Sequence, residues 1–261
     1  MRAWPLLPPV APCPLLALGL LAVARLSAQG QDAYLLGKVS STGFWYYFPV
    51  VLAVKTPIPL LILAAAGAWI AIARKQHRVL VAWIAVILLP MMLSRMDLGV
   101  RHILPVYVPL SIAAALAVLH LSRSMSGRVF AAVCCLWLAA NSVMAHPDYL
   151  AWMNRFAGRH PERVVVDSNL DWGQDVIRLA AACRLHHVDR LGLALYGTAD
   201  ITRLGLPPSH EIDPFVAAPG WYAVSESIVV PAQARDPRAY SWLTSSARYE
   251  RVGPSIRLYF H

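Results

Sequence analysis

The residues best suited to chemistry lie together at positions 167–175, which read DSNLDWGQD. This stretch follows the apolar segment Val164–Val166, a predicted strand, and leads into a predicted helix over Gln174–Cys183. In α/β domains, ligands bind at the points where strands lead into helices. Carboxylates, amides and a stacking indole could together bind a glycan or an acceptor. The side chains that supply them are Asp167, Asn169, Asp171, Trp172, Gln174 and Asp175.

Two other interpretations of this stretch stay open. Asp171 and Gln174 have the spacing of a helix capping box, and Asp175 would favour the helix dipole. The pattern Asp-x-Asn-x-Asp over 167–171 begins like a calcium loop, but residues 172–175 do not fit the later positions of such a loop. No pair of cysteines has metal-ligand spacing. We therefore predict no metal site and no cofactor, with a divalent cation as the lesser alternative.

A second group of candidate residues surrounds an aromatic run that begins at Phe44. Tyr and Trp concentrate where a membrane meets water, and nearby cations can bind an anionic headgroup or a lipid-linked phosphate. An arginine can hold a phosphate through two parallel hydrogen bonds. The residues predicted to bind a lipid-linked phosphate are Lys38, Trp45, Tyr46, Tyr47, Lys55, Arg95, Arg101 and His102. The alternative, that these cations only contact lipid headgroups, stays open.

The composition indicates a membrane protein. The chain has 261 residues, of which 58% are hydrophobic and 14% are charged, against about a quarter charged in soluble domains. Apolar stretches lie at 5–24, 57–73, 79–94, 103–121 and 129–145, near the roughly 17–25 residues that cross a bilayer. We predict a membrane all-α bundle of about five transmembrane helices over residues 1–146. The stretch at 5–24 is expected to be an anchor, with a cleaved signal as the alternative.

The positive charge belongs to the first part of the chain. Residues 1–146 hold eleven Lys/Arg and two acids, which accounts for the whole net charge of +9, and residues 147–261 are balanced. These cations flank apolar stretches instead of forming a stripe on a polar face, so no nucleic-acid partner is expected. The basic turn at 74–78 favours the cytoplasm for that loop, which places residues 147–261 outside.

Residues 147–261 alternate short apolar stretches with turn residues, which predicts a small extracytoplasmic α/β domain. The predicted elements, besides the strand and helix around 167–175, are strands over Leu191–Tyr196, Trp221–Ser225 and Ile256–Phe260 and a short helix near Tyr240–Ser245. Strand, helix and strand over 164–196 would form one βαβ unit.

Five segments together resemble the carboxy-terminal half of bacterial GT-C membrane glycosyltransferases. These enzymes depend on polyprenyl-phosphate sugars and are related to protein mannosyltransferases and to the lipid A aminoarabinose transferase. The segments are YLLGKVSSTGFWYYFPVVLAVKTPIPLL, GVRHILPVYVPL, HPDYLAWMNRFAG, VVVDSNLDWGQDVIRLA and LALYGTAD.

The resemblance implies transfer of a sugar from a polyprenyl-phosphate carrier to an acceptor on the outer face of the bacterial inner membrane. In such an enzyme a carboxylate activates the acceptor and cations hold the departing phosphate. Lys55 and Arg101 match that cationic side.

The chain departs from the family in one respect. Full-length members carry their catalytic acid in the first outer loop, whereas the only acid here before residue 34 is Asp32. No catalytic residue is therefore assigned, and enzymatic activity stays open. We expect a fragment of a longer transferase or a chain that a partner completes; the alternative is a non-catalytic membrane subunit whose outer domain binds a glycan or a partner protein. The expected partners are the bilayer and the polyprenyl-phosphate sugar.

Overall fold

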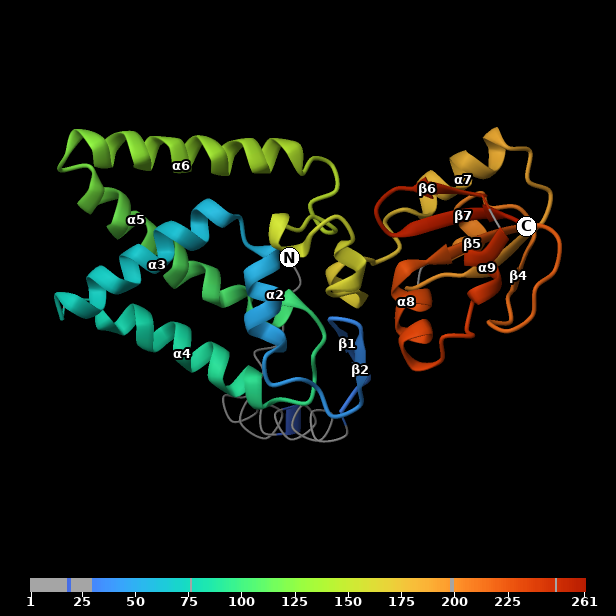
Figure 1. Cartoon of the computed structure of the whole chain (residues 1–261), viewed down its shortest axis with the longest axis horizontal. Helices are drawn as coiled ribbons and strands as arrows, with labels where there is room; N and C mark the ends of the chain where they lie inside the picture. The colour runs from blue at the N-terminus through green and yellow to red at the C-terminus, as the bar shows by residue number, and fades with distance from the viewer. Residues whose placement is uncertain (1–17, 20–29, 76, 198–199, 247) are drawn as a thin grey trace, which may run out of the picture.

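The computed structural model describes residues 18–19, 30–75, 77–197, 200–246 and 248–261. A helical region lies beside a domain built on a five-stranded sheet, and the chain passes from the first to the second (Figure 1). The predicted span at 5–24 falls outside the described residues, apart from residues 18–19.

The helical region follows the apolar stretches of the sequence closely. Its elements are α2 (Tyr47–Lys55), α3 (Ile58–Ala73), α4 (Arg78–Leu93), the 3-10 helix η1 (Val100–Val106), α5 (Tyr107–Leu121) and α6 (Met125–Met144). Among the described residues, two helical stretches are long and apolar enough to cross a membrane: Val100–Leu121 with 22 residues and Met125–Met144 with 20. Helices α2 and α3 form a third such stretch if they are counted as one bent span.

Helices α3 and α5 pack closely because small residues lie between them. A Cβ added at Gly67 of α3 would lie 1.7 Å from the carbonyl oxygen of Ala113 in α5. Ala64, Ala114 and Ala117 are buried in the same contact. Small side chains let two helix backbones approach in this way, which is how helices associate inside membranes.

Helix α2 runs across the other helices (Figure 1), and its axis bends by 117° from that of α3. The bend falls at Thr56, which precedes Pro57 and has an extended backbone with ψ of 133°. A residue before proline disfavours the α conformation, so the helix ends there. The buried face of α2, with Tyr47 and Phe48, then packs on η1 through Ile103.

The α/β domain contains a mixed sheet in the order β4-β3-β5-β7-β6. Its strands are β3 (Leu191–Ala194), β4 (Ser209–Glu211), β5 (Trp221–Ser225), β6 (Arg248–Val252) and β7 (Ile256–Phe260). Strand β3 is parallel to β4 and β5, whereas β7 is antiparallel to β5 and β6. Helix α7 (Val176–Leu185) contributes to one apolar cluster of the sheet, while α8 (Glu226–Arg235) and α9 (Ser241–Ser246) contribute to the other.

Two predictions about this part of the chain need correction. The segment Val164–Val166 is not a strand, although Val165 and Val166 are buried. Its backbone turns back on itself, since the amides of Val164 and Val165 donate to Pro161 O. The predicted βαβ unit is therefore wrong, because a short apolar run alone does not distinguish a strand from a buried loop.

Short elements join the two regions. They are the antiparallel hairpin of β1 (Ala33–Leu35) and β2 (Lys38–Ser40) and the 3-10 turns η2 (Arg155–Ala157), η3 (Pro161–Arg163) and η4 (Asp167–Asn169). A further 3-10 turn, η5 (Ile201–Arg203), lies inside the α/β domain between β3 and β4. Strand β1 packs against the segment that carries η4, since Tyr34, Val166 and Leu170 share one apolar cluster. This packing fixes the position of the polar stretch 167–175.

Candidate functional site

A cavity of about 620 Å³ lies where the helical region meets the α/β domain. Its walls come from the segment at β1, the loop before η1, the η4 turn, the end of β3 and helix α8. The polar side chains that line it include Tyr34, Arg101, Asp167, Tyr196, Ser227 and Arg235. The cavity therefore exists only when the two regions are packed together.

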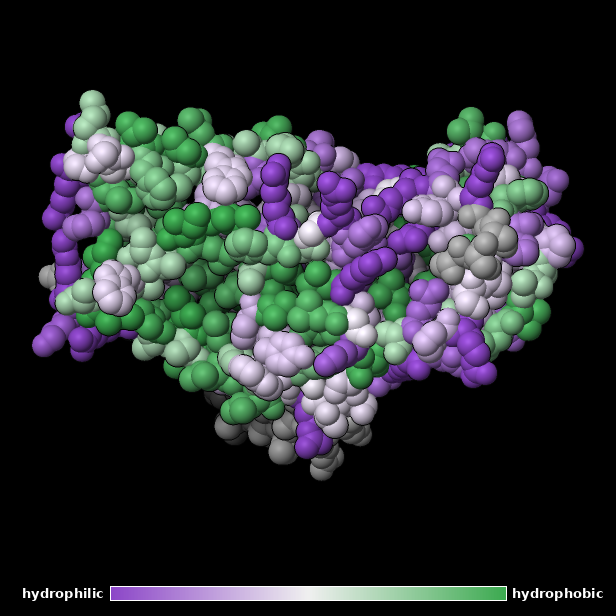
Figure 2. Space-filling view, in the orientation of Figure 1, coloured by the Kyte–Doolittle hydropathy of each residue, from purple (hydrophilic) through white to green (hydrophobic). Residues whose placement is uncertain are grey.

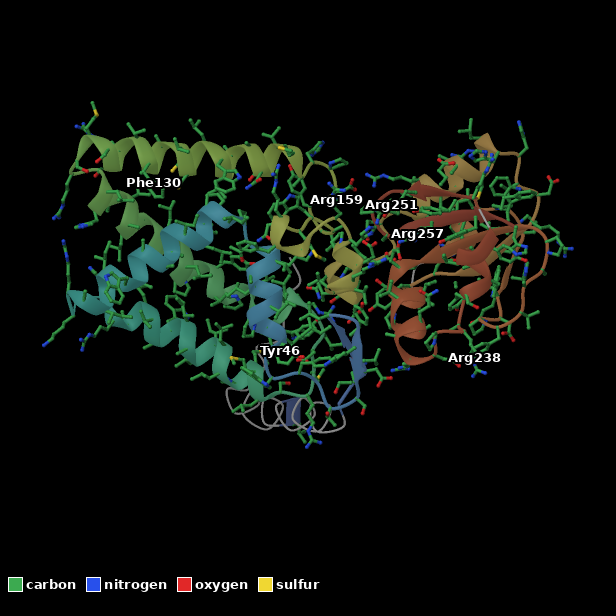
Figure 3. All side chains as sticks on the ribbon, in the orientation of Figure 1. Tyr46, Phe130, Arg159, Arg238, Arg251 and Arg257 are labelled. Carbon is green, nitrogen blue, oxygen red and sulfur yellow. The ribbon has the colours of Figure 1, made fainter. Side chains whose placement is uncertain are left out.

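The surface changes character at the same junction. Hydrophilic side chains gather between the hydrophobic helices and the α/β domain (Figure 2). Arg159, Arg251 and Arg257 are among them (Figure 3). If the helices lie in a membrane, this junction is the boundary between lipid and water.

Arg101 lies at the second position of η1 and is exposed. Its guanidinium lies over the indole of Trp172, 4.8 Å from the ring centroid, and its Nε donates to Nε2 of His102 at 3.3 Å. Stacking on an aromatic face orients the guanidinium. The remaining N–H groups of Arg101 make no hydrogen bond to the described residues, so an anion in the cavity could accept from them.

Asp167 carries backbone strain at the cavity wall. Its φ is +60°, in the left-handed region that residues other than glycine seldom adopt. The strained conformation is supported from both sides, because its amide donates to Oγ of Ser227 at 3.1 Å and its Oδ1 accepts from the Tyr196 hydroxyl. Burial raises the pKa of Asp167, while the hydrogen bond from Tyr196 and the charge of Arg101 lower it. Strain of this kind concentrates at functional sites.

Asn169 faces away from the cavity and holds the helical region to the η4 turn. Its Oδ1 accepts from the amide of Val100 at 2.9 Å, and its Nδ2 donates to the Tyr47 hydroxyl at 2.9 Å. Asn169 is 1% exposed. Both residues were predicted to bind ligands, but Tyr47 and Asn169 pair with each other in the interior.

Asp171 and Asp175 are also buried and bonded within the fold. Asp171 accepts from the Ser225 hydroxyl and from the amide of Gly173 at 2.8 Å. Asp175 accepts from the amide of Ser255 at 2.9 Å and from its hydroxyl at 2.8 Å. These two carboxylates attach the 167–175 stretch to strand β5 and to the β6–β7 turn.

The alternative interpretation of Asp171 and Gln174 as a capping box is wrong. Helix α7 begins at Val176, so its N-cap is Asp175, which makes no side-chain cap. Gln174 instead bonds within its own loop: its Oε1 accepts from the Trp172 amide at 2.7 Å and its Nε2 donates to Leu170 O at 2.9 Å. Trp172 is left half-exposed beneath Arg101. In the part of the chain that the structure describes, no group of three or more His, Cys, Asp or Glu could hold a metal ion.

Lys55 does not line the junction cavity. Its Nζ donates to Leu150 O at 2.6 Å, to Trp152 O at 3.2 Å and to Asn169 O. An ammonium group has three N–H bonds, so these three carbonyls occupy all of them. Lys55 thus ties the end of α2 to two segments that follow α6.

The remaining predicted phosphate ligands lie outside the cavity walls. Lys38 on β2 and Arg95 in the loop after α4 are exposed, and Trp45 is exposed beside Tyr46 with ring centroids 5.5 Å apart. His102 is exposed and accepts a hydrogen bond from Arg101 at 3.3 Å. Of the residues predicted to bind donor or acceptor, the structure places Arg101 and Asp167 on the cavity wall, with Trp172 and His102 in support.

Sequence reasoning missed several residues of the site. Tyr196 stands at the carboxyl end of a predicted strand and is followed by Gly197, which has a positive φ of 118°. That position is where parallel strands present ligand-binding residues, so Tyr196 could have been found. Ser227 offered a comparable signal, because it follows the predicted strand Trp221–Ser225 within a Ser-Glu-Ser run, whereas Tyr34 did not stand at the carboxyl end of a predicted strand.

Comparison with models of known protein families, with curated proteins and with solved structures gave no match. The geometry and the chemistry of the residues therefore carry the functional argument.

Proposed function

We propose that the junction cavity binds a sugar linked to a polyprenyl phosphate, and that the chain acts as the carboxy-terminal part of a membrane glycosyltransferase. The observation that carries the proposal is the position of Arg101. It lines a cavity of about 620 Å³ at the boundary between apolar helices and a polar domain. In a lipid-linked sugar, the isoprenoid tail would lie along the apolar helices, the phosphate at Arg101 and the sugar against the polar domain.

The roles of the residues follow from their chemistry. The Arg101 guanidinium, stacked on Trp172, would hold the phosphate through two hydrogen bonds. Asp167 and Tyr196 would bind hydroxyl groups of the sugar. In the transfer, the oxygen of an acceptor hydroxyl bonds to the anomeric carbon while the bond from that carbon to the phosphate oxygen breaks, and the proton of that hydroxyl is released to water. The phosphate leaves on the lipid, and Arg101 would stabilise its negative charge.

The arrangement of charges supports an orientation in the bacterial inner membrane. The turn between α3 and α4 carries Arg74, Lys75 and Arg78, and the turn between α5 and α6 carries Arg123. Both turns lie at the end of the helices that is far from the α/β domain (Figure 1). Basic loops favour the cytoplasmic side. We therefore place the α/β domain outside the cytoplasm, with α3, α4, α5 and α6 as spans.

A second candidate function is a membrane subunit that binds a glycan without catalysis. The observation that favours it is the pairing of the carboxylates on the cavity wall. Asp32 forms an ion pair with Arg235, and Asp167 accepts from Tyr196. Carboxylates with such partners bind hydroxyl groups more readily than they remove protons. The transferase requires a lipid-linked phosphate at Arg101, whereas a glycan-binding subunit requires only groups that bind hydroxyls, such as Asp167 and Tyr196.

Binding of decaprenyl phosphate to the whole chain in lipid nanodiscs tests the proposal. Arg101→Ala is expected to weaken binding about tenfold, as for the loss of a charge-assisted hydrogen bond. Arg95→Ala is the matched control, because Arg95 is exposed on the same side of the helical region but does not line the cavity. Equal affinities of the wild-type and Arg101→Ala chains would refute the proposal.

A further inference from the structure

A second cavity, of about 420 Å³, lies within the α/β domain. It opens beyond the carboxyl ends of the parallel strands β3 and β4, and residues of α8 and of the segment before α9 complete its wall. Open sheets with parallel strands bind ligands at that edge. The volume is within the range of small-molecule sites, about 300–1,000 Å³.

The lining combines apolar walls with uncharged and acidic polar groups. Leu193, Ile201 and Ile212 form part of the apolar surface, and Ser209, His210 and Glu211 of β4 form the polar side. No lysine or arginine is among the described residues that line this cavity. The charge of Glu211 would therefore repel an anionic ligand, with no cation in the lining to balance it. A neutral ring that carries hydroxyl groups could instead donate hydrogen bonds to Glu211 and pack its ring on the apolar surface.

Tyr240 supports a ligand-binding role for this cavity. It lines the wall, it is buried, and its φ is +55°, in the left-handed region. Its amide donates to Pro214 O at 2.6 Å, which holds the strained conformation. Burial raises the pKa of the Tyr240 phenol, and the charges of Glu211 and Asp213 raise it further. Glu211 lines the same cavity as Tyr240. A strained tyrosine beside a carboxylate gives the cavity two different hydrogen-bonding groups at one wall.

Tyr196 belongs to both cavities. It lines the junction cavity and the second cavity, and its hydroxyl donates to Asp167 in the first. The next residue, Gly197, packs against the loop that supports Arg101: a Cβ there would lie 3.6 Å from the Gly173 amide nitrogen and 3.7 Å from the carbonyl carbon of Trp172. The two cavities therefore meet at Tyr196 and at Ile228, which also lines both.

We propose that the second cavity binds a neutral hydroxylated ligand, a carbohydrate ring, and that this ligand is the acceptor of the sugar held in the junction cavity. The carbohydrate site stands on the lining residues alone, whereas its role as acceptor rests on the proposed function. Tyr196 then contacts both substrates, and a ligand in one cavity alters the position of the Tyr196–Asp167 pair in the other.

The test uses the whole chain in nanodiscs and saturation-transfer NMR with a panel of methyl hexopyranosides as probes. We expect saturation transfer to at least one glycoside in the wild-type chain, and affinity about tenfold weaker in Glu211→Ala, for the loss of a hydrogen bond to a charged group. Ser209→Trp, which fills the cavity mouth from an exposed edge strand, should give the same loss. Asp189→Asn is the control, since Asp189 is exposed and does not line the cavity.

The outcomes separate this proposal from the proposed function. Arg101→Ala should leave glycoside binding intact, because Arg101 lines only the other cavity. No saturation transfer to any glycoside in the wild-type chain, or equal transfer in Glu211→Ala, Ser209→Trp and Asp189→Asn, would overturn the second site. If Glu211→Ala loses glycoside binding while Arg101→Ala still binds decaprenyl phosphate, the carbohydrate site in the second cavity is supported. The proposed phosphate site at Arg101 is then refuted.

Discussion

The hydroxyl of Tyr196 donates a hydrogen bond to Oδ1 of Asp167, which joins the end of strand β3 to the η4 turn. The two residues are 29 positions apart in the sequence, and neither belongs to the helical region. Arg101, which does belong to it, lines the same cavity. The pair thus connects the α/β domain to the place where the proposed phosphate binds.

Removing this hydrogen bond should change how the site responds to pH. The bond lowers the pKa of Asp167 against the effect of burial, so Tyr196→Phe should raise that pKa. Ligand hydroxyls donate to the charged carboxylate. The measurement is the affinity for a decaprenyl-phosphate sugar between about pH 4 and pH 8. The fall in affinity toward acid pH should occur at a higher pH in Tyr196→Phe than in the wild-type chain. Tyr249→Phe, at an exposed tyrosine of β6, is the control. Superimposable profiles for the Tyr196→Phe and wild-type chains would contradict this account.

Lys55 should matter for stability more than for ligand binding. Lys55→Met leaves three backbone carbonyls without their charged donor, which should cost about 2 kcal/mol and lower the unfolding temperature in detergent by roughly 5 °C. Lys38→Met, at an exposed lysine of β2, should leave that temperature unchanged. If Lys55→Met instead weakens decaprenyl phosphate binding at an unchanged unfolding temperature, Lys55 is a phosphate ligand and the structural role is wrong.

Asp97 should make the protein less stable as the pH rises. Burial raises its pKa to about 6, although the Phe44 amide bonded to its Oδ2 lowers it. Its Oδ1 is buried and has no hydrogen-bond partner among the described residues. The folded chain therefore holds this proton more tightly than the unfolded chain, and stability falls as pH rises from about 4 to about 6.

Asp97→Asn removes the titrating group and should remove that fall. The variant should be more stable than the wild-type chain at neutral pH by about 2 kcal/mol and should show no slope from this position in thermal unfolding followed across the same pH window. Asp189→Asn, at an exposed acid, should keep the wild-type slope. A wild-type slope in Asp97→Asn would show that another group is responsible.

The contact between α3 and α5 should tolerate no side chain at Gly67. Gly67→Leu places a Cβ against the backbone of Ala113, and the resulting helix displacement should cost about 3 kcal/mol or more. Ala65→Leu is the matched control on the same helix, because Ala65 is exposed. Size-exclusion chromatography and thermal unfolding in detergent distinguish the two variants. Equal behaviour of both would mean that α3 and α5 do not pack through Gly67.

Helices α3, α4, α5 and α6 were predictable to within a few residues because uninterrupted apolar composition marks them directly, whereas α2 and α8 were not predicted. The stretch at 129–145 is part of α6, and the true start at Met125 depends on Ser124, whose Oγ accepts from the Gly127 amide at 3.1 Å. Strands β5 and β7 have the predicted bounds. Strands β4 and β6 were not predicted, because most of their residues are exposed and polar and lack the alternation that identifies a strand.

The site was predictable in position but not in detail. The stretch 167–175 could be recognised as unusual, yet four of its carboxylate and amide side chains serve the fold and one carboxylate faces the cavity. The difference depends on distant partners: Ser225 lies 54 residues from Asp171, and Ser255 lies 80 residues from Asp175. Local spacing carries no information about such contacts.

In the proposed function, Arg101 and Asp167 face a lipid-linked phosphate sugar at the membrane boundary. The most direct measurement is photo-crosslinking of the whole chain in nanodiscs with a polyprenyl phosphate that carries a diazirine next to its phosphate, followed by peptide mapping. The account predicts label in the peptides that contain Leu98 to Arg101 and Val166 to Asp167, and loss of that label with excess decaprenyl phosphate. Label confined to the opposite end of the helices, at residues 74–78, would contradict it.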